Sequence, residues 1–460
     1  MKQGRTVPPP LRQALSSLLA ERWVEDADRL TEHGRDPSCH PAAPPQAIAY
    51  PLSTSEAREI VMLCAQHRAP IIPYGAGSSV EGSTLATEGG IAIDMSRMNR
   101  IKQLHHEDQD VVVEAGVTRL QLAEALAQSA LFFSVDPGAD ATIGGMASTR
   151  ASGTNTVRYG TIRENVLALE VLLADGSLIR TGSRARKSSS GYDLTRLFIG
   201  AEGTLGLITE LTVRLHPRPQ AISAAVCSFP TLRAAIETAS TLLQEGLRVA
   251  RVELLDAAAV EAVNRHSSME HDVAPTLFFE FHGSAATVQE RAQEAERCAG
   301  RFGGSSFRWS ANEKEREQLW HARHNAYYAI RALNEAAIAV STDICVPISS
   351  LADCIDETVE DRERSGLTAP LVGHVGDGNV HFIVLAAGES ERAAAAAFHE
   401  RLVERALRYD GTCSGEHGIG IGKRKFMRAE HGDAVEVMRR LKRELDPQGI
   451  FNPGKLLPED

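Results

Sequence analysis

The stretch from Gly373 to His381 limits the local fold of this chain more tightly than any other part of its sequence. It has Asp377-Gly378 at its centre, and apolar strand formers lie on both sides at 371–372 and 382–384. An Asp-Gly pair between two such runs favours a type I′ turn, whose two central residues need positive φ. The sequence therefore predicts an antiparallel hairpin with a two-residue turn.

The predicted turn determines which side chains of the hairpin face each other. Counting outward from the turn pairs Gly376 with Asn379, and His374 with His381. Directly opposed residues of an antiparallel pair hold their Cβ atoms about 5 Å apart, so two imidazoles could converge on one metal ion. Asn379 shares the face of His381, because strand side chains alternate. A hairpin whose histidines are merely solvated is the alternative at this point.

A glycine-rich loop from Gly411 to Gly420 supplies a third candidate ligand. It holds Glu416 and His417 among four glycines, and so many glycines in ten residues indicate a backbone that approaches another group closely. Two histidines and a carboxylate with open positions are typical of a catalytic divalent site. Glu416 is thus a candidate ligand and His417 a candidate base, whereas a tight turn without chemistry is the alternative.

Two other glycine-rich segments lie in the first half of the chain. The segment 75–84 stands between the strand patterns 69–74 and 90–95, so it lacks the helix that a Rossmann fingerprint requires directly after its glycines. Its backbone N–H groups nevertheless suit a phosphate. The segment 137–160 shows few regular elements over more than twenty residues, and a long irregular segment in a compact domain indicates that it wraps a ligand. An extended cofactor is the natural candidate.

The rest of the chain follows an α+β pattern. Residues 11–23 after three prolines predict a first helix rather than a transit peptide. Prolines at 217 and 219 mark a domain boundary, after which strands alternate with alanine-rich helices. A helical pattern at 320–331 carries Arg323, which could clamp a carboxylate bidentately. An ordinary exposed helix arginine is the alternative.

Bulk composition excludes several classes of partner. The chain has 460 residues, enough for two or three domains, and its formal net charge of -11 argues against nucleic acid or anionic lipid. Seven cysteines without a C-x-x-C pair favour a reducing, cytoplasmic setting over a disulfide framework. No apolar run approaches the roughly 20 residues needed to span a bilayer, so contact with the inner membrane is expected to be peripheral at most.

Three segments, 341–349, 374–381 and 411–423, resemble the cytochrome-linked D-lactate dehydrogenases, which are flavoproteins of the vanillyl-alcohol oxidase type. The resemblance covers essentially the whole chain. It implies an α+β fold with a PCMH-type FAD-binding domain at 1–219. An α+β cap domain with an antiparallel sheet and the metal site would follow at 220–424, and 425–460 would return to the FAD domain.

The resemblance also assigns roles to single residues. His374, His381 and Glu416 would ligate zinc or manganese, and His417 would be the base. Arg323 and Asn379 would hold the substrate. The residues implied for FAD are Tyr74, Gly75, Ala76, Gly77, Ser78, Ser79, Gly82, Ser83, Pro137, Gly138, Thr142, Gly144, Gly145, Ser148, Gly153, Thr154, Tyr159, Glu202, Gly203, Gly206, Ile208 and Asn452.

Two departures from the family pattern refine these expectations. Covalent members attach FAD through a histidine in the first glycine loop, where this chain has Ser78, so noncovalent FAD is expected. The related D-2-hydroxyglutarate dehydrogenases carry a lysine at the position of Ser341, so a substrate with one carboxylate is expected. The implied reaction is oxidation of a D-2-hydroxy acid, D-lactate first, with a hydride passing to FAD and then reoxidation by cytochrome c, a quinone or a similar acceptor.

Other functions stay open on the sequence alone. Glycolate or D-2-hydroxyglutarate could be the substrate of a glycolate oxidase-like FAD subunit, or the chain could be a noncatalytic FAD-binding subunit, which the Glu416-His417 pair disfavours. A redox-neutral transferase similar to the alkyl-glycerone-phosphate synthases is a further alternative, disfavoured by the form of the histidine hairpin. A homodimer is an assembly that the sequence allows.

Overall fold

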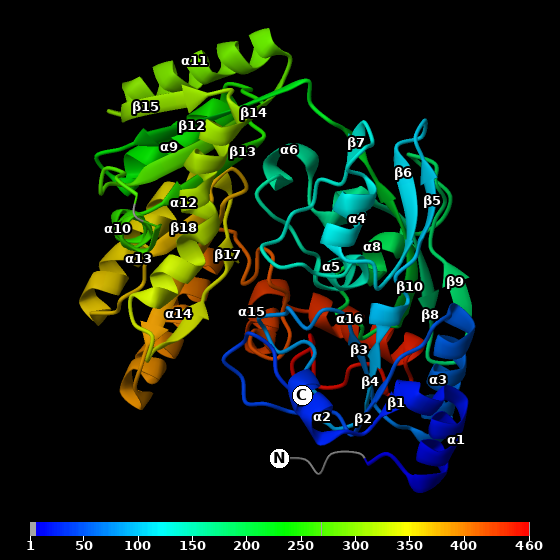
Figure 1. Ribbon diagram of the computed structural model, residues 1–460. Helices are drawn as coiled ribbons and strands as arrows, with labels where there is room; N and C mark the ends of the chain where they lie inside the picture. Colours follow the sequence, from blue (N-terminus) through cyan, green and yellow to red (C-terminus); the bar gives the residue numbers. More distant parts are fainter. Residues whose placement is uncertain (1–5, 268, 460) are drawn as a thin grey trace. The chain divides into compact units, whose positions relative to one another are not determined.

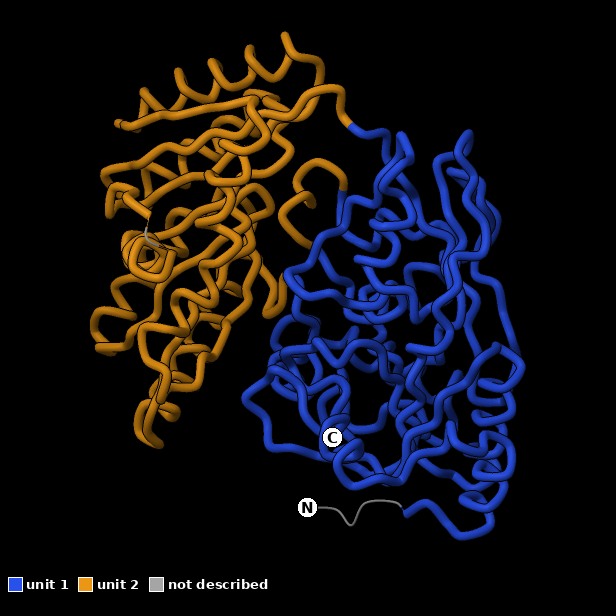
Figure 2. Tube along the Cα trace, in the orientation of Figure 1, with its two compact units in different colours: residues 1–152, 160–218, 416–460 blue, residues 153–159, 219–415 orange. Residues whose placement is uncertain are grey.

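Two units share the chain, and neither is a continuous segment. The computed structural model describes residues 6–267 and 269–459. Unit 1 comprises residues 1–152, 160–218 and 416–460, and unit 2 comprises residues 153–159 and 219–415 (Figure 2). Each unit has its own sheets, as the α+β class predicts.

Unit 1 contains two main sheets (Figure 1). The first has the order β1 (Trp23–Val24), β2 (Ala47–Ala49), β4 (Ile91–Asp94) and β3 (Ile71–Tyr74), with β2 and β3 parallel to β4. The second is antiparallel, with the order β5 (Ile101–His105), β6 (Asp110–Glu114), β10 (Leu207–Arg214), β8 (Val166–Leu172) and β9 (Leu178–Arg180). β7 (Leu131–Phe132) pairs with β11 (His216–Pro217).

Helices complete unit 1. The first helix is α1 (Pro9–Leu19), which buries Leu11, Leu15 and Leu19 on one face because these residues recur at intervals of four. It ends at Leu19 rather than at the predicted Trp23, which begins β1. The others are α2 (Ala27–His33), α3 (Thr54–His67), α4 (Arg119–Ala125), α5 (Ile143–Thr149), α7 (Ile162–Asn165), α8 (Leu194–Phe198), α15 (Met427–His431) and α16 (Ala434–Leu445).

Unit 2 is built on an eight-stranded antiparallel sheet. Its order is β15 (Ser305–Ser310), β12 (Ala221–Ser228), β14 (Thr276–Gly283), β13 (Arg251–Leu255), β18 (Leu371–His374), β19 (Asn379–Ala386) and β16 (Ile338–Ser341), while β17 (Ile344–Cys345) also pairs with β19.

Helices pack against this sheet. Apolar side chains of α10 (Ala257–Ser267) and α12 (Glu313–Ala332) form one buried cluster with Phe278, Val372 and Ile383 of the strands. The remaining helices are α6 (Thr156–Tyr159), α9 (Leu232–Gln244), α11 (Ala285–Arg301), α13 (Leu351–Ser365) and α14 (Glu389–Arg408).

The units differ from the expected domains at two places. Residues 153–159 fall in unit 2 rather than in the FAD domain, because Asn155 accepts a hydrogen bond from Arg251 (3.1 Å) and the Tyr159 hydroxyl lies 2.7 Å from Nδ1 of His282. Unit 1 resumes at residue 416 rather than 425. The backbone N–H groups of Ile419 and Gly420 donate to the buried Glu202 at 2.6 and 2.8 Å, which ties this loop to unit 1.

None of the described helices combines the length and the apolar composition needed to cross a membrane.

Candidate active site

The histidine hairpin forms, but its register differs from the prediction. His374 lies opposite Asn379, and His381 lies opposite Val372. The loop therefore has four residues, 375–378, and the backbone N–H of Asp377 donates to the carbonyl of His374 at 2.9 Å. Only Gly378 of the Asp-Gly pair has a positive φ, of 76°, so the turn is not type I′. The predicted pairing of His374 with His381 was wrong.

Both histidines nevertheless lie on one face of the sheet. The true register is shifted by two residues along β19, and side chains alternate with a period of two, so the shift leaves each side chain on the expected face. The two imidazole centroids are 5.5 Å apart and the rings are nearly perpendicular, at 86°. Both side chains are buried, with Asn379 beside them on the same face.

Hydrogen bonds fix which nitrogen of each imidazole carries its proton. Nδ1 of His374 lies 2.7 Å from Oε1 of Glu253, and Nδ1 of His381 lies 2.9 Å from the carbonyl oxygen of Thr342. A carboxylate and a carbonyl only accept, so both Nδ1 atoms carry hydrogen. Nε2 then holds the lone pair in each neutral ring. This is the arrangement in which histidine usually binds a metal.

Glu253 is a charged residue at the centre of this face. It lies on β13 next to β18 and is only 1% exposed. Its Oε2 accepts hydrogen bonds from Nε and Nη2 of Arg323 on α12, at 2.8 and 2.6 Å. Burial alone would raise the pKa of the Glu253 carboxyl, but the neighbouring His374 and Arg323 lower it. The predicted substrate ligand Arg323 therefore has two of its guanidinium nitrogens engaged by a protein carboxylate.

Asn379 presents one kind of group to its surroundings. Its Nδ2 donates to Oδ1 of Asp343 (2.8 Å) and to the carbonyl of Ile344 (2.7 Å), which uses both amide hydrogens. Neither partner can donate, so the side-chain amide cannot be flipped. Its Oδ1 is buried and has no hydrogen-bond partner among the described residues. Asn379 can therefore act toward a ligand only as an acceptor.

The loop with Glu416 and His417 begins the last segment of unit 1. Oε2 of Glu416 accepts from the Ser152 hydroxyl at 2.5 Å, and Nε2 of His417 lies 3.7 Å from Oε1 of Glu416. Burial raises the pKa of the Glu202 carboxyl that holds the same loop, although hydrogen bonds from Ile419, Ser83 and Gly420 act in the opposite direction. Glu416 belongs to unit 1, whereas His374 and His381 belong to unit 2. The binding of one metal ion by all three residues therefore stays a prediction.

The chain before Glu416 is nevertheless fixed to the histidine face of unit 2. The Ser414 hydroxyl donates to Oδ2 of Asp343 at 2.8 Å. Gly415 lies so close to Asn379 that an added Cβ would be 2.1 Å from Nδ2 of the amide. Only a residue without a side chain fits there. Glu416 is the next residue along the chain, which supports its selection as the third ligand.

Most of the predicted FAD residues lie in unit 1. Gly75 to Ser83 follow β3, and a Cβ at Gly75 would be 2.4 Å from Oγ1 of Thr142, so the two glycine-rich segments touch. Nδ2 of Asn452 donates to the carbonyls of Ser83 (2.9 Å) and Glu202 (2.8 Å). Three separate parts of the chain therefore meet around this loop. Gly153, Thr154 and Tyr159 are the exceptions, because they belong to unit 2.

Unit 1 also offers features that suit a bound polar cofactor. Oδ1 of Asn452 and Oγ1 of Thr84 are buried without a hydrogen-bond partner among the described residues. A Cβ added to Gly138 would meet no atom within 4 Å, so this glycine borders open space. Unused acceptors and an open glycine backbone fit a ligand with hydroxyl, amide and phosphate groups.

Sequence reasoning missed Glu253 and Asp343. Glu253 stands inside an apolar strand, Arg251 to Leu255, and a lone acid in a buried strand was the only signal available. Its partner His374 lies 121 residues away in the sequence. Asp343 belongs to a segment that carried the family resemblance, but nothing local linked it to Asn379.

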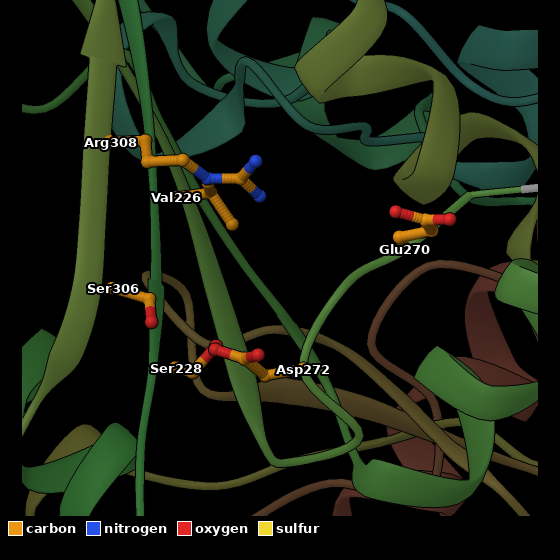
Figure 3. Close-up of a pocket in the computed structure, with 6 residues that line it drawn as sticks. All are labelled: Val226, Ser228, Glu270, Asp272, Ser306 and Arg308. Atoms are coloured by element: carbon orange, nitrogen blue, oxygen red, sulfur yellow. The ribbon is translucent and has the colours of Figure 1, made fainter.

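A hollow elsewhere in unit 2 contains none of the predicted site residues (Figure 3). Its volume is about 200 Å³, and it lies over β12 and β15, with β14 and β13 between them and the hairpin strand β18. The lining residues are Val226, Ser228, Glu270, Asp272, Ser306 and Arg308. The exposed carboxylates of Glu270 and Asp272 and the guanidinium of Arg308 do not form a recognisable catalytic or metal-binding group there.

Two family models match the chain. The family described as FAD linked oxidases, C-terminal domain, matches residues 218–456, and an FAD binding domain family matches residues 45–182. The chain belongs to the FAD-linked oxidase family. It is an FAD-dependent oxidoreductase, as the resemblance implied.

Curated relatives cover nearly the whole length of this FAD-linked oxidase. It is 48% identical to a probable mitochondrial D-lactate dehydrogenase of Danio rerio, over 93% of this chain and 87% of the relative. It is 43% identical to the mitochondrial D-lactate dehydrogenase [cytochrome] of Arabidopsis thaliana, over 99% of this chain and 81% of the relative. It is 32% identical to the glycolate oxidase subunit GlcD of Bacillus subtilis, over 90% of both chains.

Solved structures share the fold at low sequence identity. A 4-ethylphenol oxidase from Gulosibacter chungangensis superposes with a TM-score of 0.80 at 17% identity, covering 100% of this chain and 99% of that one. An alkyldihydroxyacetonephosphate synthase superposes with a TM-score of 0.77 at 19% identity, covering 99% and 87%. Because an oxidase and a synthase both have this fold, the fold by itself does not select the reaction.

Proposed function

We propose that this FAD-linked oxidase oxidises a D-2-hydroxy acid, D-lactate in the first place, to the 2-oxo acid and passes the electrons to a cytochrome-type acceptor. One observation carries the proposal. Two histidines on one face of the unit 2 sheet are oriented through Nδ1 by Glu253 and the Thr342 carbonyl, so that Nε2 is the nitrogen that would bind a metal, in a chain whose relatives at 48% and 43% identity are named D-lactate dehydrogenases.

The donor set supports a divalent ion at this face. His374, His381 and Glu416 would hold it, and two imidazoles with one carboxylate suit zinc or manganese. When bound, such an ion would polarise the carboxylate and the C2 oxygen of the substrate and make the hydroxyl more acidic. The buried setting of both histidines, 8% and 6% exposed, would keep competing water away.

The glycine-rich segments of unit 1 support noncovalent FAD. The residues from Tyr74 to Ser83, together with Thr142 to Ser148, Glu202 and Asn452, would hold it, and the loop sequence 75–84 itself contains no histidine for a covalent link. When bound, FAD accepts the two electrons and the hydrogen removed from C2. Gly153, Thr154 and Tyr159, which belong to unit 2, complete the set of residues proposed for the cofactor.

The proton and the carboxylate are handled by residues of this chain. His417 would take the proton of the C2 hydroxyl, as a positioned imidazole does in general base catalysis. Asn379 would offer its unpartnered Oδ1 as an acceptor beside the substrate. The part of the Arg323 guanidinium that is not bound to Glu253 would be left to attract the substrate carboxylate.

A second candidate substrate is glycolate. The 32% identical glycolate oxidase subunit of Bacillus subtilis favours it, because the two chains align over 90% of their lengths. Both candidates carry one carboxylate, as the serine at position 341 predicts.

The proposal retains a cytoplasmic setting, because none of the cysteines forms a disulfide.

An anaerobic titration tests the substrate assignment. We expect D-lactate to bleach the visible flavin absorption of the purified holoenzyme, and L-lactate to leave it unchanged. D-2-hydroxyglutarate and glycolate, tested in parallel, define the tolerated side chain. A holoenzyme that no D-2-hydroxy acid bleaches would refute the proposed function. The metal is tested separately. The divalent ion content of the purified protein is measured, and the bleaching by D-lactate is repeated in the presence of a chelator.

A further inference from the structure

His374, Glu253 and Arg323 form a continuous buried chain in unit 2. Glu253 places one carboxylate oxygen 2.7 Å from Nδ1 of His374 and the other 2.8 and 2.6 Å from two nitrogens of Arg323. The three groups come from β18, β13 and α12. Each therefore depends on a different element for its position.

We infer that Glu253 is a positioning residue that fixes Nε2 of His374 as a metal-ligating nitrogen, and that Arg323 holds Glu253 in this position in addition to its proposed attraction for the substrate carboxylate. The inference rests on the proposed metal site. It adds a second role to the sequence-based hypothesis, in which Arg323 acts only by holding the substrate.

The geometry of Glu253 explains why a carboxylate is needed. It receives donors on both oxygens, from an imidazole on one side and a guanidinium on the other. An amide has only one accepting atom, so a glutamine here would have to turn an N–H₂ group toward either His374 or Arg323. The Arg323 guanidinium offers two N–H groups to this position, and an amide oxygen that accepts both turns its N–H₂ group toward Nδ1 of His374. The hydrogen bond to His374 would then be lost, and the tautomer of His374 would no longer be fixed.

The two donors of Arg323 explain how Glu253 keeps its orientation. Nε and Nη2 both donate to Oε2, so the guanidinium holds this oxygen and leaves Oε1 facing Nδ1 of His374. A carboxylate bound to the second ring nitrogen of a metal-ligating histidine increases the basicity of that histidine as a ligand. A lysine at position 323 has a single nitrogen and cannot reproduce the two-atom contact.

A second constellation on the same sheet provides a matched control. Glu280 on β14 is also buried, lies 2.7 Å from Nε2 of His282 and is paired with Arg251 at 3.5 Å. It has the same three residue types as the Glu253 chain, but His282 is not a predicted metal ligand. Glu280→Gln therefore removes a comparable buried charge without touching His374.

The test measures metal affinity directly. Wild type, Glu253→Gln, Arg323→Lys and Glu280→Gln are depleted of metal and titrated with Zn²⁺ and with Mn²⁺ by calorimetry. Circular dichroism confirms folding. We expect the first two variants to bind about 10- to 100-fold more weakly, the range typical of lost partners of metal-bound histidine, and Glu280→Gln to bind like wild type.

Several outcomes would contradict the inference. Unchanged affinity in Glu253→Gln would overturn it, and so would an equal loss in Glu280→Gln, which would indicate a general effect of removing buried charge. If Arg323→Lys kept its metal affinity and only raised the KM for D-lactate, Arg323 would be a direct substrate ligand instead. A wild type that binds neither ion would refute the proposed metal site and this inference together, whereas D-lactate bleaching would still report on the proposed oxidation.

Discussion

Lys455, close to the end of the chain, allows a quantitative prediction of how the free energy of unfolding changes with pH. Its side chain is 4% exposed, and Nζ donates to the carbonyl of Leu85 at 2.6 Å and to Oγ1 of Thr87 at 3.3 Å. Burial lowers the pKa of Lys455 from 10.5 to about 8, despite the opposing effect of Glu202. At 1.36 kcal/mol for each pK unit, this difference corresponds to about 3 kcal/mol.

The sign follows from proton binding in the two states. Below pH 8 both the folded and the unfolded protein hold the Lys455 proton, so the full cost of burying the charge is present. Between pH 8 and 10.5 the unfolded protein holds the proton and the folded protein releases it, so the free energy of unfolding rises with pH. Above pH 10.5 the lysine is neutral in both states, and the cost is absent.

The substitution Lys455→Met isolates this contribution. Methionine cannot titrate, so the stability of wild type relative to the variant should increase by about 3 kcal/mol between pH 7.5 and pH 10.5. Urea unfolding at a series of pH values, with the same excess of FAD, measures it. Lys187→Met, at an exposed position, is the control and should show no such change. A difference between wild type and Lys455→Met that stays constant over this range would refute the reasoning.

Three further predictions concern the two predicted sites. His417→Ala should slow flavin reduction by D-lactate about 10²- to 10⁴-fold in stopped-flow experiments while metal content is retained, and an unchanged rate would exclude His417 as the base. Asn379→Ala removes the hydrogen bonds from the amide to Oδ1 of Asp343 and to the carbonyl of Ile344, so thermal unfolding should show a loss of about 1–3 kcal/mol, and steady-state kinetics should show a raised KM. Gly144→Val would place its Cβ 2.7 Å from the Cβ of Ala115, so the purified variant should carry less FAD per chain by absorbance, and full occupancy would contradict this account.

The hairpin shows what local sequence could and could not predict. Strands on both sides of Asp377-Gly378 and the common face of the two histidines were predicted, because faces depend only on the period of two. The turn was not, since Gly378 serves a different purpose. A Cβ there would be 2.0 Å from the carbonyl oxygen of Val346, and Val346 donates its N–H to Gly378. The glycine is required by the close approach of Val346, which follows β17, rather than by a type I′ turn.

The same limit applies to the site. Residue types that bind metals could be recognised within short motifs, as with His374 and His381. The groups that support these histidines could not be recognised in the same way. Glu253 reaches His374, and Thr342 reaches His381, only through the pairing of the strands and the packing of α12. Likewise, composition placed a boundary near residue 219, but it contained no sign that 153–159 leave one unit for the other.

The contact between Asn452 and Ser83 has a consequence for the order of events during synthesis. These residues are 369 positions apart, and the Asn452 amide donates to the Ser83 carbonyl in the first glycine loop. At about 5–20 residues per second, a ribosome needs roughly 20–70 s to travel that distance. Residues 219–415 are all synthesised in this interval and can fold, while the first glycine loop still lacks its contact with Asn452. A nascent chain arrested before residue 452 should therefore hold FAD poorly, even though nearly all the other predicted contacts of the cofactor have already been made.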